Sequence, residues 1–424
     1  MGFSWSSCIA QATTISVVKA AGIDEANIAC DTEEFPDQCH EIAVVATDDI
    51  ILIHTNVEQA LARLEVLDAA LAEACIPKAL EKDENACDMI VGLGCILRGS
   101  PPRVDPNPLK VWPLLQAILG LTSSRNASPL GVCGMLGVAQ WFCILSRPIF
   151  SCFDHVYPFV RREPGDTIGH VPAAVIGELL LFLALLPLAG AALDRPWAPL
   201  AVATDAAPDF GFGISVAGIS SEFAASLGRK SERRGDYVRL DRTTGILTEP
   251  EKPRLGTPIH LPLDPSHFTD VLSLRASRPE HSGSLELKGV RLGLRWALRK
   301  VGRFHHRLLF LVDARASIAA IAKGRSGAAS FKRTLSSIGA LQLATGTLLR
   351  CLYIPSEDNP ADAPSRGKPR RKRRMVRVQR FDKHERRLHR AVRELDRRNI
   401  FIENNSDFDS FSGSEGGRCE EQLL

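Results

Sequence analysis

The chain has 424 residues, of which 45% are hydrophobic and 24% are charged, so it can fill real cores and a wholly disordered chain is excluded. Its formal net charge of +3 is unevenly distributed, because residues 366–398 carry +12, residues 401–424 carry −5 and the remainder carries −4. This distribution predicts a mildly acidic folded body, a basic block and an acidic tail, and the length suits about two or three domains.

The first residues and the cysteines narrow the class of protein. Residues 1–7 contain no basic region followed by an apolar core, so they do not resemble a secretory signal peptide. The 11 cysteines include no CxxC pair, which argues against a zinc ribbon or knuckle. An odd count without an export signal predicts reduced thiols, mostly small buried residues, in an intracellular protein of the nucleus or cytoplasm.

The first hundred residues are predicted to combine two helices with short strands. Two β-branched apolar runs within residues 41–54 flank Asp48 and Asp49, a pattern typical of a tight hairpin. Asn56 can cap a helix whose leucines repeat at helical spacing. The predicted elements are a helix over 4–21, the hairpin, a helix over 57–75 and a short strand over 89–97 that glycines interrupt.

A largely helical segment is predicted over residues 108–193, with helices at 111–121, 130–145 and 173–193. Residues 171–193 are apolar for about the 20 residues that span a bilayer. They include Glu178 and Pro187, however, and a carboxylate inside a membrane is costly. We therefore expect a buried core helix here rather than a membrane span, and no membrane partner.

A second α/β unit is predicted after the boundary signal Pro196-Trp197-Ala198-Pro199. The polar stretch 221–258 is rich in charged residues, glycine and proline, and is expected to be an insertion with little structure of its own. The predicted strands are 200–204, 211–217, 308–312 and 348–354, and the predicted helices are 285–301, 314–323 and 332–342.

Four carboxylates of this second unit occupy positions that suit a metal site. Asp205 and Asp313 each close an apolar strand, where open α/β sheets place their sites. Glu286 lies among apolar residues of a predicted helix, and Asp362 opens a short final helix. Carboxylate oxygens suit Mg²⁺, and two such ions about 4 Å apart support phosphodiester hydrolysis. A single aspartate after a strand is usually a cap or turn residue, but four acids in this order are far less expected by chance.

The segments around these carboxylates resemble the ribonuclease H domain of retroelement polyproteins. The resemblance lies in Ala203-Thr204-Asp205-Ala206-Ala207-Pro208-Asp209-Phe210-Gly211-Phe212-Gly213, Leu285-Glu286-Leu287, Leu311-Val312-Asp313-Ala314 and Tyr353-Ile354-Pro355-Ser356-Glu357-Asp358-Asn359-Pro360-Ala361-Asp362-Ala363-Pro364-Ser365-Arg366. The last motif is the most specific of the four. The resemblance implies that the catalytic, metal-binding carboxylates are Asp205, Glu286, Asp313 and Asp362, holding two Mg²⁺ ions for which Mn²⁺ can substitute.

The chain departs from this family in two ways that bear on activity. Asp205 and Glu286 are 81 residues apart, a long separation for which the insertion over 221–258 accounts. No histidine lies between Asp313 and Asp362, where many relatives carry one that helps product release. Slow or absent turnover is therefore an alternative expectation.

The resemblance continues upstream into reverse transcriptase. Gly2-Phe3-Ser4-Trp5-Ser6 with Gln11 resembles the motif that opens the palm helix, Ala46-Thr47-Asp48-Asp49 the catalytic hairpin, and Val91-Gly92-Leu93-Gly94-Cys95 the hairpin that grips the primer. It implies that Asp48 and Asp49 can bind a metal ion weakly. Two-metal nucleotidyl transfer needs a further aspartate, from a strand expected before residue 1. We therefore expect a truncated polyprotein fragment without a complete polymerase site.

The basic block opens with a dense run of cations, Lys368-Pro369-Arg370-Arg371-Lys372-Arg373-Arg374. The residues predicted to neutralise nucleic-acid phosphates without sequence preference are Arg370, Arg371, Lys372, Arg373 and Arg374. The run also suits nuclear import, and a solvated linker is the alternative interpretation. The acidic tail after the block is expected to be disordered.

Together these patterns predict an α/β (α+β) protein that acts on nucleic acid. Its predicted segments are a partial reverse-transcriptase palm over 1–107, a helical thumb or connection over 108–197, a ribonuclease H-like domain with a mixed five-stranded sheet and flanking helices over 198–367, and a largely disordered tail over 368–424. The predicted reaction is Mg²⁺-dependent hydrolysis of RNA in an RNA–DNA hybrid. The alternatives are an inactive retroelement relic and a nucleic-acid-binding protein that works through residues 366–398. The sequence leaves the oligomeric state open.

Overall fold

The structure is a computed structural model that describes residues 5–29, 35–36, 39–80, 83–232, 237–240 and 257–368. All of these residues belong to one compact unit, Met1–Val376. The predicted nucleic-acid-binding residues Arg370, Arg371, Lys372, Arg373 and Arg374 lie outside the described residues, as does the predicted tail from residue 369 onward. Their roles stay predictions.

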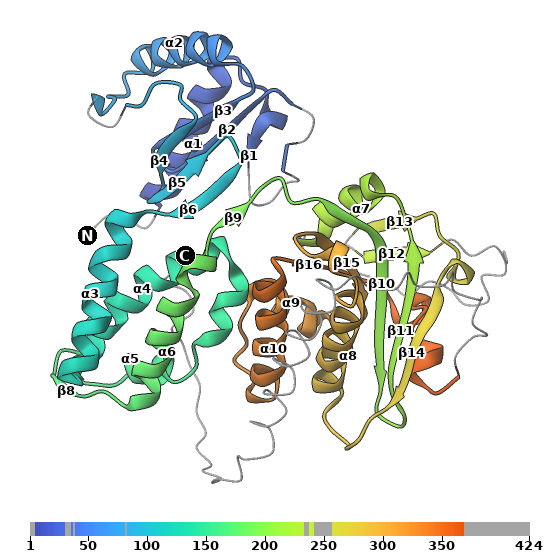
Figure 1. The fold of residues 1–424 in the computed structure, drawn as a ribbon. Helices are drawn as coiled ribbons and strands as arrows, with labels where there is room; N and C mark the ends of the chain where they lie inside the picture. Colours follow the sequence, from blue (N-terminus) through green and yellow to red (C-terminus); the bar gives the residue numbers. More distant parts are fainter. Residues whose placement is uncertain are drawn as a thin grey trace. The chain divides into compact units, whose positions relative to one another are not determined.

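The N-terminal part contains the predicted hairpin and both predicted helices (Figure 1). The hairpin strands pair antiparallel with Ala46 opposite Asp49, which leaves Thr47 and Asp48 as the turn. Asn56 accepts the backbone N–H of Gln59 at 2.9 Å and so caps the second helix, as predicted. The elements are α1 (Ser6–Ala20), η1 (Glu25–Asn27), β1 (Ile28–Ala29), β2 (Glu41–Ala46), β3 (Asp49–His54), α2 (Val57–Glu73), β4 (Met89–Gly92), β5 (Cys95–Arg98) and β6 (Arg103–Pro106).

The segment predicted as one interrupted strand over 89–97 is two strands, β4 and β5, joined by a two-residue turn. Leu93 and Gly94 have φ angles of 51° and 73°, and two successive positive φ values define the type I′ turn that suits the twist of a hairpin. The hairpin implied by the resemblance is therefore present, and the single-strand prediction was wrong because Gly94 marks a turn rather than a weak point in a strand.

The predicted helical segment is confirmed over its first two helices, but its third helix is shorter than expected. It ends at Leu185 rather than Leu193, because Pro187 lacks the N–H that would continue the helix. A core containing the fully buried Phe142, Leu179 and Phe182 holds these helices together. The elements are α3 (Pro108–Ser124), β7 (Asn126–Ala127), α4 (Pro129–Leu145), η3 (Arg147–Cys152), α5 (Val156–Val160), β8 (Gly169–His170), α6 (Ala173–Leu185), η4 (Leu186–Leu188) and β9 (Ala191–Ala192).

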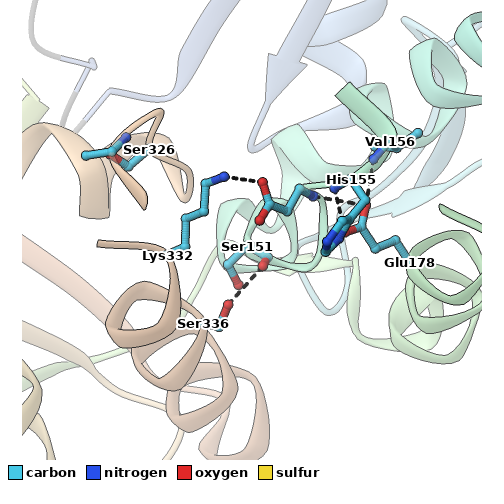
Figure 2. A network of polar contacts seen from close by, with 9 residues as sticks. Ser151, His155, Val156, Glu178, Ser326, Lys332 and Ser336 are labelled. Atoms are coloured by element: carbon cyan, nitrogen blue, oxygen red, sulfur yellow. Dashed lines mark hydrogen bonds and ion pairs between the residues drawn. The ribbon is translucent and has the colours of Figure 1, made fainter. Parts of the chain in front are cut away.

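The one charge of α6 has a clear structural role. Glu178 accepts the backbone N–H groups of Asp154, His155 and Val156 at 3.0, 2.7 and 3.0 Å, at the start of α5 (Figure 2). A carboxylate there satisfies helix donors that would otherwise lack partners. The predicted core helix is thus confirmed. In the described part of the chain, no helix combines the length and the apolar character that crossing a membrane requires.

The third part is a seven-stranded mixed sheet with helices packed against it (Figure 1). Its strand order is β13-β12-β16-β15-β10-β11-β14, and β11 runs antiparallel to both of its neighbours. The elements are β10 (Trp197–Ala207), β11 (Gly211–Gly218), α7 (Ser221–Gly228), η5 (Arg229–Glu232), β12 (Tyr237–Leu240), β13 (Pro258–Leu261), η6 (Pro265–His267), β14 (Thr269–Arg275), α8 (Ser282–Ala297), η7 (Val301–Arg303), β15 (Arg307–Val312), α9 (Arg315–Lys323), α10 (Ala329–Thr345), β16 (Leu348–Tyr353), η8 (Ser356–Asp358) and α11 (Asp362–Ser365).

The mixed α/β class is confirmed, with two corrections to the expected sheet. The expected five-stranded sheet corresponds to β14-β11-β10-β15-β16, but β12 and β13 extend it from five strands to seven. The segment 221–258, expected to have little structure, begins with α7 and includes β12. Leu227 of α7 and Val238 of β12 are buried in the core of the sheet, so a polar composition hid a few well-placed apolar residues.

Hydrophobic cores lie within each of the three segments predicted before residue 368, although the predicted boundaries themselves stay predictions. Polar contacts join α10 to η3 of the helical part (Figure 2). Lys332 forms an ion pair with Asp154, and Ser336 Oγ donates to the backbone oxygen of Ser151 at 3.0 Å. Leu343 of α10 also packs against the helical core.

Every cysteine among the described residues is free of a disulfide, and the reduced state of the thiols stays a prediction. Their predicted burial is only partly correct. Cys95, Cys143 and Cys351 are buried, whereas Cys8, Cys75 and Cys87 are exposed. Burial raises the pKa of the Cys351 thiol to about 12, so this residue behaves as a small core side chain.

Candidate metal centre

Two neighbouring strands bring Asp205 and Asp313 together. β10 and β15 are parallel, with Thr204 opposite Val312. Asp205 and Asp313 follow these two residues, so they lie at the same end of the sheet. Both strands are buried apolar runs, which is typical of parallel strands that are covered on both faces. The local sequence therefore determines the strands, and their register determines the meeting of the two acids.

The helix α8 supplies the third carboxylate because it lies close against β10. A Cβ atom at Gly289 would lie 3.4 Å from the backbone oxygen of Asp205, and one at Gly293 would lie 2.8 Å from Cγ2 of Thr204. Larger side chains at these positions would push the helix away from the sheet. Glu286 is one turn before Gly289 on the same face of α8, so the close approach carries its carboxylate to the strand ends.

Asp205, Glu286 and Asp313 form one carboxylate cluster. Each offers an oxygen, and these three atoms lie within 4.8 Å of one another. Asp205 is buried, and the other two side chains are half-buried. Within the described residues, Oε2 of Glu286 and Oδ1 of Asp313 are buried without any hydrogen-bond partner. Buried carboxylate oxygens without donors are costly, and a hard divalent cation would satisfy them.

Burial and mutual repulsion perturb the titration of this cluster. Burial and then the charge of Asp313 raise the pKa of Asp205 to about 7. Burial, followed by the charges of Asp313 and Asp205, raises the pKa of Glu286 to about 9. The apo cluster therefore retains protons at neutral pH, whereas a bound cation would favour the ionised forms. The donor set and its electrostatics fit Mg²⁺ or Mn²⁺.

Asp362, the fourth predicted ligand, stands at the edge of the cluster rather than inside it. Its Oδ1 accepts hydrogen bonds from Nε and Nη2 of Arg366 at 2.9 and 2.7 Å. Its charge nevertheless contributes to raising the pKa of Asp205, so the two carboxylates are near one another. The structure thus brings three of the four predicted acids together and places the fourth beside them, paired with an arginine.

Two residues of the closing motif, Ser356 and Asn359, support the cluster, although sequence reasoning assigned them no role. Ser356 Oγ donates to Oδ2 of Asp313 at 3.1 Å. The Asn359 side chain donates to the backbone oxygen of Thr204 at 3.0 Å, and Asp358 pairs with Arg239 at 2.9 Å. An open pocket of about 410 Å³ next to these residues is lined by Ser356, Asp362 and Arg366, among others. The high proportion of polar residues in the closing motif was the sequence signal that could have predicted these supporting contacts.

Asp48 and Asp49 lie in the N-terminal hairpin, away from any group of three ligands found among the described residues. The turn is instead secured by α1. Gln11 accepts the backbone N–H of Thr47 and donates to the backbone oxygen of Val45 at 2.8 Å, and Thr14 Oγ1 donates to the backbone oxygen of Thr47 at 2.9 Å. These contacts hold Thr47 at a φ of 59°. The weak metal site at Asp48 and Asp49 stays a prediction.

Comparison with known proteins assigns the chain to no family. No protein-family model matches it, and no curated protein matches it. Among solved structures, it is similar to a foamy viral protease-reverse transcriptase in complex with double-stranded DNA, with a TM-score of 0.35, 15% identity, and coverage of 81% of this chain and 48% of that chain. It is also similar to a foamy viral protease-reverse transcriptase in complex with an RNA/DNA hybrid. That match has a TM-score of 0.29 and 13% identity, and it covers 77% of this chain and 58% of that chain. The chain therefore spans about half the length of these solved chains.

Proposed function

We propose that this chain is a divalent-metal-dependent phosphodiester hydrolase that cleaves the RNA strand of an RNA–DNA hybrid. The observation that carries the proposal is the convergence of Asp205, Glu286 and Asp313, with oxygens within 4.8 Å of one another. Oε2 of Glu286 and Oδ1 of Asp313 are also buried without donors among the described residues, and a bound cation would satisfy them. The choice of a hybrid rests on the resemblance of the four carboxylate motifs to ribonuclease H.

Each residue of the centre has a proposed task. Asp205, Glu286 and Asp313 would hold the cation, and Asp362, beside them, would be a ligand for a second one. When bound, Mg²⁺ supplies charge stabilisation and a more acidic water. Ser356 keeps the carboxylate of Asp313 oriented through its hydrogen bond, and Asn359 fixes the end of β10 through the Thr204 oxygen. The protein recognises the hybrid through phosphate and 2′-OH contacts, by shape rather than by sequence.

A cleavage assay tests the proposal. The full chain is incubated with an RNA–DNA hybrid labelled on the RNA strand, in Mg²⁺, beside the variants Asp205→Asn and Asp313→Asn. We expect internal cleavage of the RNA by the wild type and a loss of about 100-fold or more in each variant, because each removes a charge that the reaction needs. EDTA should abolish cleavage, and Mn²⁺ should restore it.

A matched control separates loss of the centre from loss of charge. Asp166 is exposed, so Asp166→Asn makes the same chemical change elsewhere and should cleave like the wild type. Circular dichroism of each variant verifies folding. If the wild type and Asp205→Asn cleave at the same background rate, the chain is not a nuclease, and the alternative of an inactive relic takes its place.

A further inference from the structure

An arginine lies beside the carboxylate cluster without pairing with it. Arg315 is the first residue of α9 and follows Asp313 by two positions, so their Cα atoms are at most about 7 Å apart. Arg315 is exposed, and its guanidinium lies 4.4 Å from the centre of the Tyr353 ring. Within the part of the chain that the structure describes, this guanidinium makes no hydrogen bond and no ion pair. Stacking on the ring therefore holds a cation next to the acids but apart from them.

The strand register shows on which face of the sheet the stacked pair lies. Tyr353 pairs with Val312 across β16 and β15, and paired residues share a face. Phe310 is two residues before Val312 and so lies on that face too. A Cβ atom at Gly293 of α8 would lie 2.9 Å from Cε1 of Phe310, so this is the face that α8 covers. The stacked Arg315 thus lies at the end of β15 on the side of α8, the helix that supplies the third acid of the carboxylate cluster.

Two other arginines at the closing motif are paired with acids. Arg366 pairs with Asp362 at 2.7 Å, and Arg239 pairs with Asp358 at 2.9 Å, so their charges are offset locally. Arg315 has no such partner. It keeps its full charge and its five N–H donors, which form a planar fork that matches the oxygens of a phosphate. Stacking orders the plane of this fork and leaves its N–H edge open to an anion.

We propose that Arg315, positioned by Tyr353, binds a backbone phosphate of the cleaved strand next to the phosphate at the carboxylate cluster. This inference rests on the proposed function, because it assigns a substrate contact to that same site. A nucleic-acid strand carries one negative charge per nucleotide, so the nucleotide beside the reacting one brings a second phosphate to the cluster. Carboxylates repel this phosphate, and a fixed cation at their edge offsets the repulsion and sets the position of the strand.

Binding of the hybrid without cleavage is the first test. The full chain is titrated with a short RNA–DNA hybrid in EDTA at several salt concentrations. Arg315→Gln should weaken binding about tenfold, because a charged hydrogen bond is lost, and should lower the slope of log Kd against log salt by about one. Arg315→Lys keeps the charge but loses the planar fork, so it should keep the slope and recover part of the affinity.

Two variants of Tyr353 test its role as the positioning residue. Tyr353→Phe keeps the aromatic face and should bind the hybrid like the wild type. Tyr353→Leu keeps apolar volume but removes the ring, so we expect a loss of about threefold in affinity. Its salt slope should not change, because the charge of Arg315 is still present. Equal losses in the Phe and Leu variants would show that the stacking does not position Arg315.

Arg325→Gln is the matched control. Arg325 is also exposed and also stacked, with its guanidinium 5.3 Å from the centre of the Phe150 ring, but it follows the opposite end of α9. It should bind the hybrid like the wild type, with the full salt slope. If the wild type does not bind, if Arg315→Gln keeps affinity and slope, or if Arg325→Gln loses as much, Arg315 is not a substrate ligand. A thermal unfolding scan of each variant verifies folding.

A modified substrate separates this inference from the proposed function. The RNA strand carries one uncharged methylphosphonate, and cleavage in Mg²⁺ is mapped at the neighbouring bonds. In the wild type, we expect cleavage about tenfold weaker at the bond next to the neutral position, whereas Arg315→Gln should show no such additional loss. If the wild type cleaves no hybrid but Arg315→Gln still lowers the salt slope, the proposed function fails and the phosphate contact stands. If the wild type cleaves and both proteins show the same loss, the contact fails and the proposed function stands.

Discussion

At the scale of single residues, the carboxylate cluster places three acids where water cannot stabilise their charges. Burial and the neighbouring carboxylates therefore raise the pKa of Asp205 to about 7 and the pKa of Glu286 to about 9. Unfolded Asp and Glu release their protons near pH 4. As the pH rises from about 4, the unfolded chain ionises while the folded apo chain does not, so the free energy of unfolding must fall across this range.

The first prediction concerns this pH dependence. Asp205→Asn removes one group with a raised pKa and one source of repulsion on Glu286. In EDTA, we expect the variant to gain stability relative to the wild type as the pH rises from 4 to 8, on the order of 2 kcal/mol. Urea denaturation at both pH values measures the change.

Addition of Mg²⁺ at pH 8 should reverse this order, because the cation binds the folded wild type and stabilises it by mass action. Asp166→Asn is again the control and should follow the wild type at both pH values. A gap between Asp205→Asn and the wild type that is the same at pH 4 and pH 8 would mean that Asp205 titrates normally.

The second prediction concerns Ser356, which positions Asp313 through a hydrogen bond of 3.1 Å. Ser356→Ala should lower kcat for hybrid cleavage about tenfold, as expected for one charged hydrogen bond, and leave KM unchanged. Ser356→Thr keeps the hydroxyl and should recover most of kcat. Equal losses in the Ala and Thr variants would show that the hydroxyl is not the important group.

At the scale of elements, close backbone contacts bring the motifs together. Gly213 lies opposite Asp205 in the β10–β11 pair, and α11 packs directly on it. A Cβ atom at Gly213 would lie 2.2 Å from the backbone oxygen of Ala361 and 2.4 Å from the Ser365 nitrogen. No side chain fits there without moving the segment that carries Asp362. The glycine therefore connects the first motif to the last.

The third prediction follows from this contact. Gly213→Ala should lower the free energy of unfolding by about 1–3 kcal/mol, because it overpacks a contact between two backbones. Gly218 is the matched control in the same strand, since a Cβ atom there would have no neighbour within 4 Å. Gly218→Ala should change stability by less than about 0.5 kcal/mol. Denaturant unfolding compares the two, and equal losses would contradict the proposed packing.

At the scale of the whole molecule, α10 connects the helical core to the sheet. It packs against α8, and Leu343 reaches the helical core. A Cβ atom at Gly339 would lie 2.9 Å from the backbone oxygen of Pro148 and 2.8 Å from Oγ of Ser151, so α10 lies very close to η3. Ser336 of α10 also donates to the backbone oxygen of Ser151 in η3 (Figure 2). The two cores are therefore expected to unfold together.

The fourth prediction tests that coupling. Gly339→Leu inserts a side chain between α10 and η3 and should split a single calorimetric unfolding transition into two, as the cores lose their connection. Gly120→Leu, on the open face of α3, adds the same side chain where a Cβ atom has no neighbour within 4 Å. It should leave one transition. If both variants unfold alike, the contact between α10 and η3 does not couple the cores.

Much of the fold was predictable because it depends on local patterns. The apolar runs that end at Asp205 and Asp313 define buried strands, and Asn56 marks a helix start. Segments whose structure comes from a few apolar contacts were not predictable. Leu227 and Val238 are buried although the stretch around them has the composition of a loop. The sequence of β14 contains no strand motif, and its strand structure depends on pairing with β11.

For the site, the sequence by itself determined the candidate acids and their order along the chain, since strand ends and a closing motif can be identified locally. Only the tertiary structure decided which acids meet. The register of β10 and β15 and the glycines of α8 unite Asp205, Glu286 and Asp313, whereas Arg366 holds Asp362 aside. Such meetings leave no local signal, because they join strands and helices that are distant in sequence.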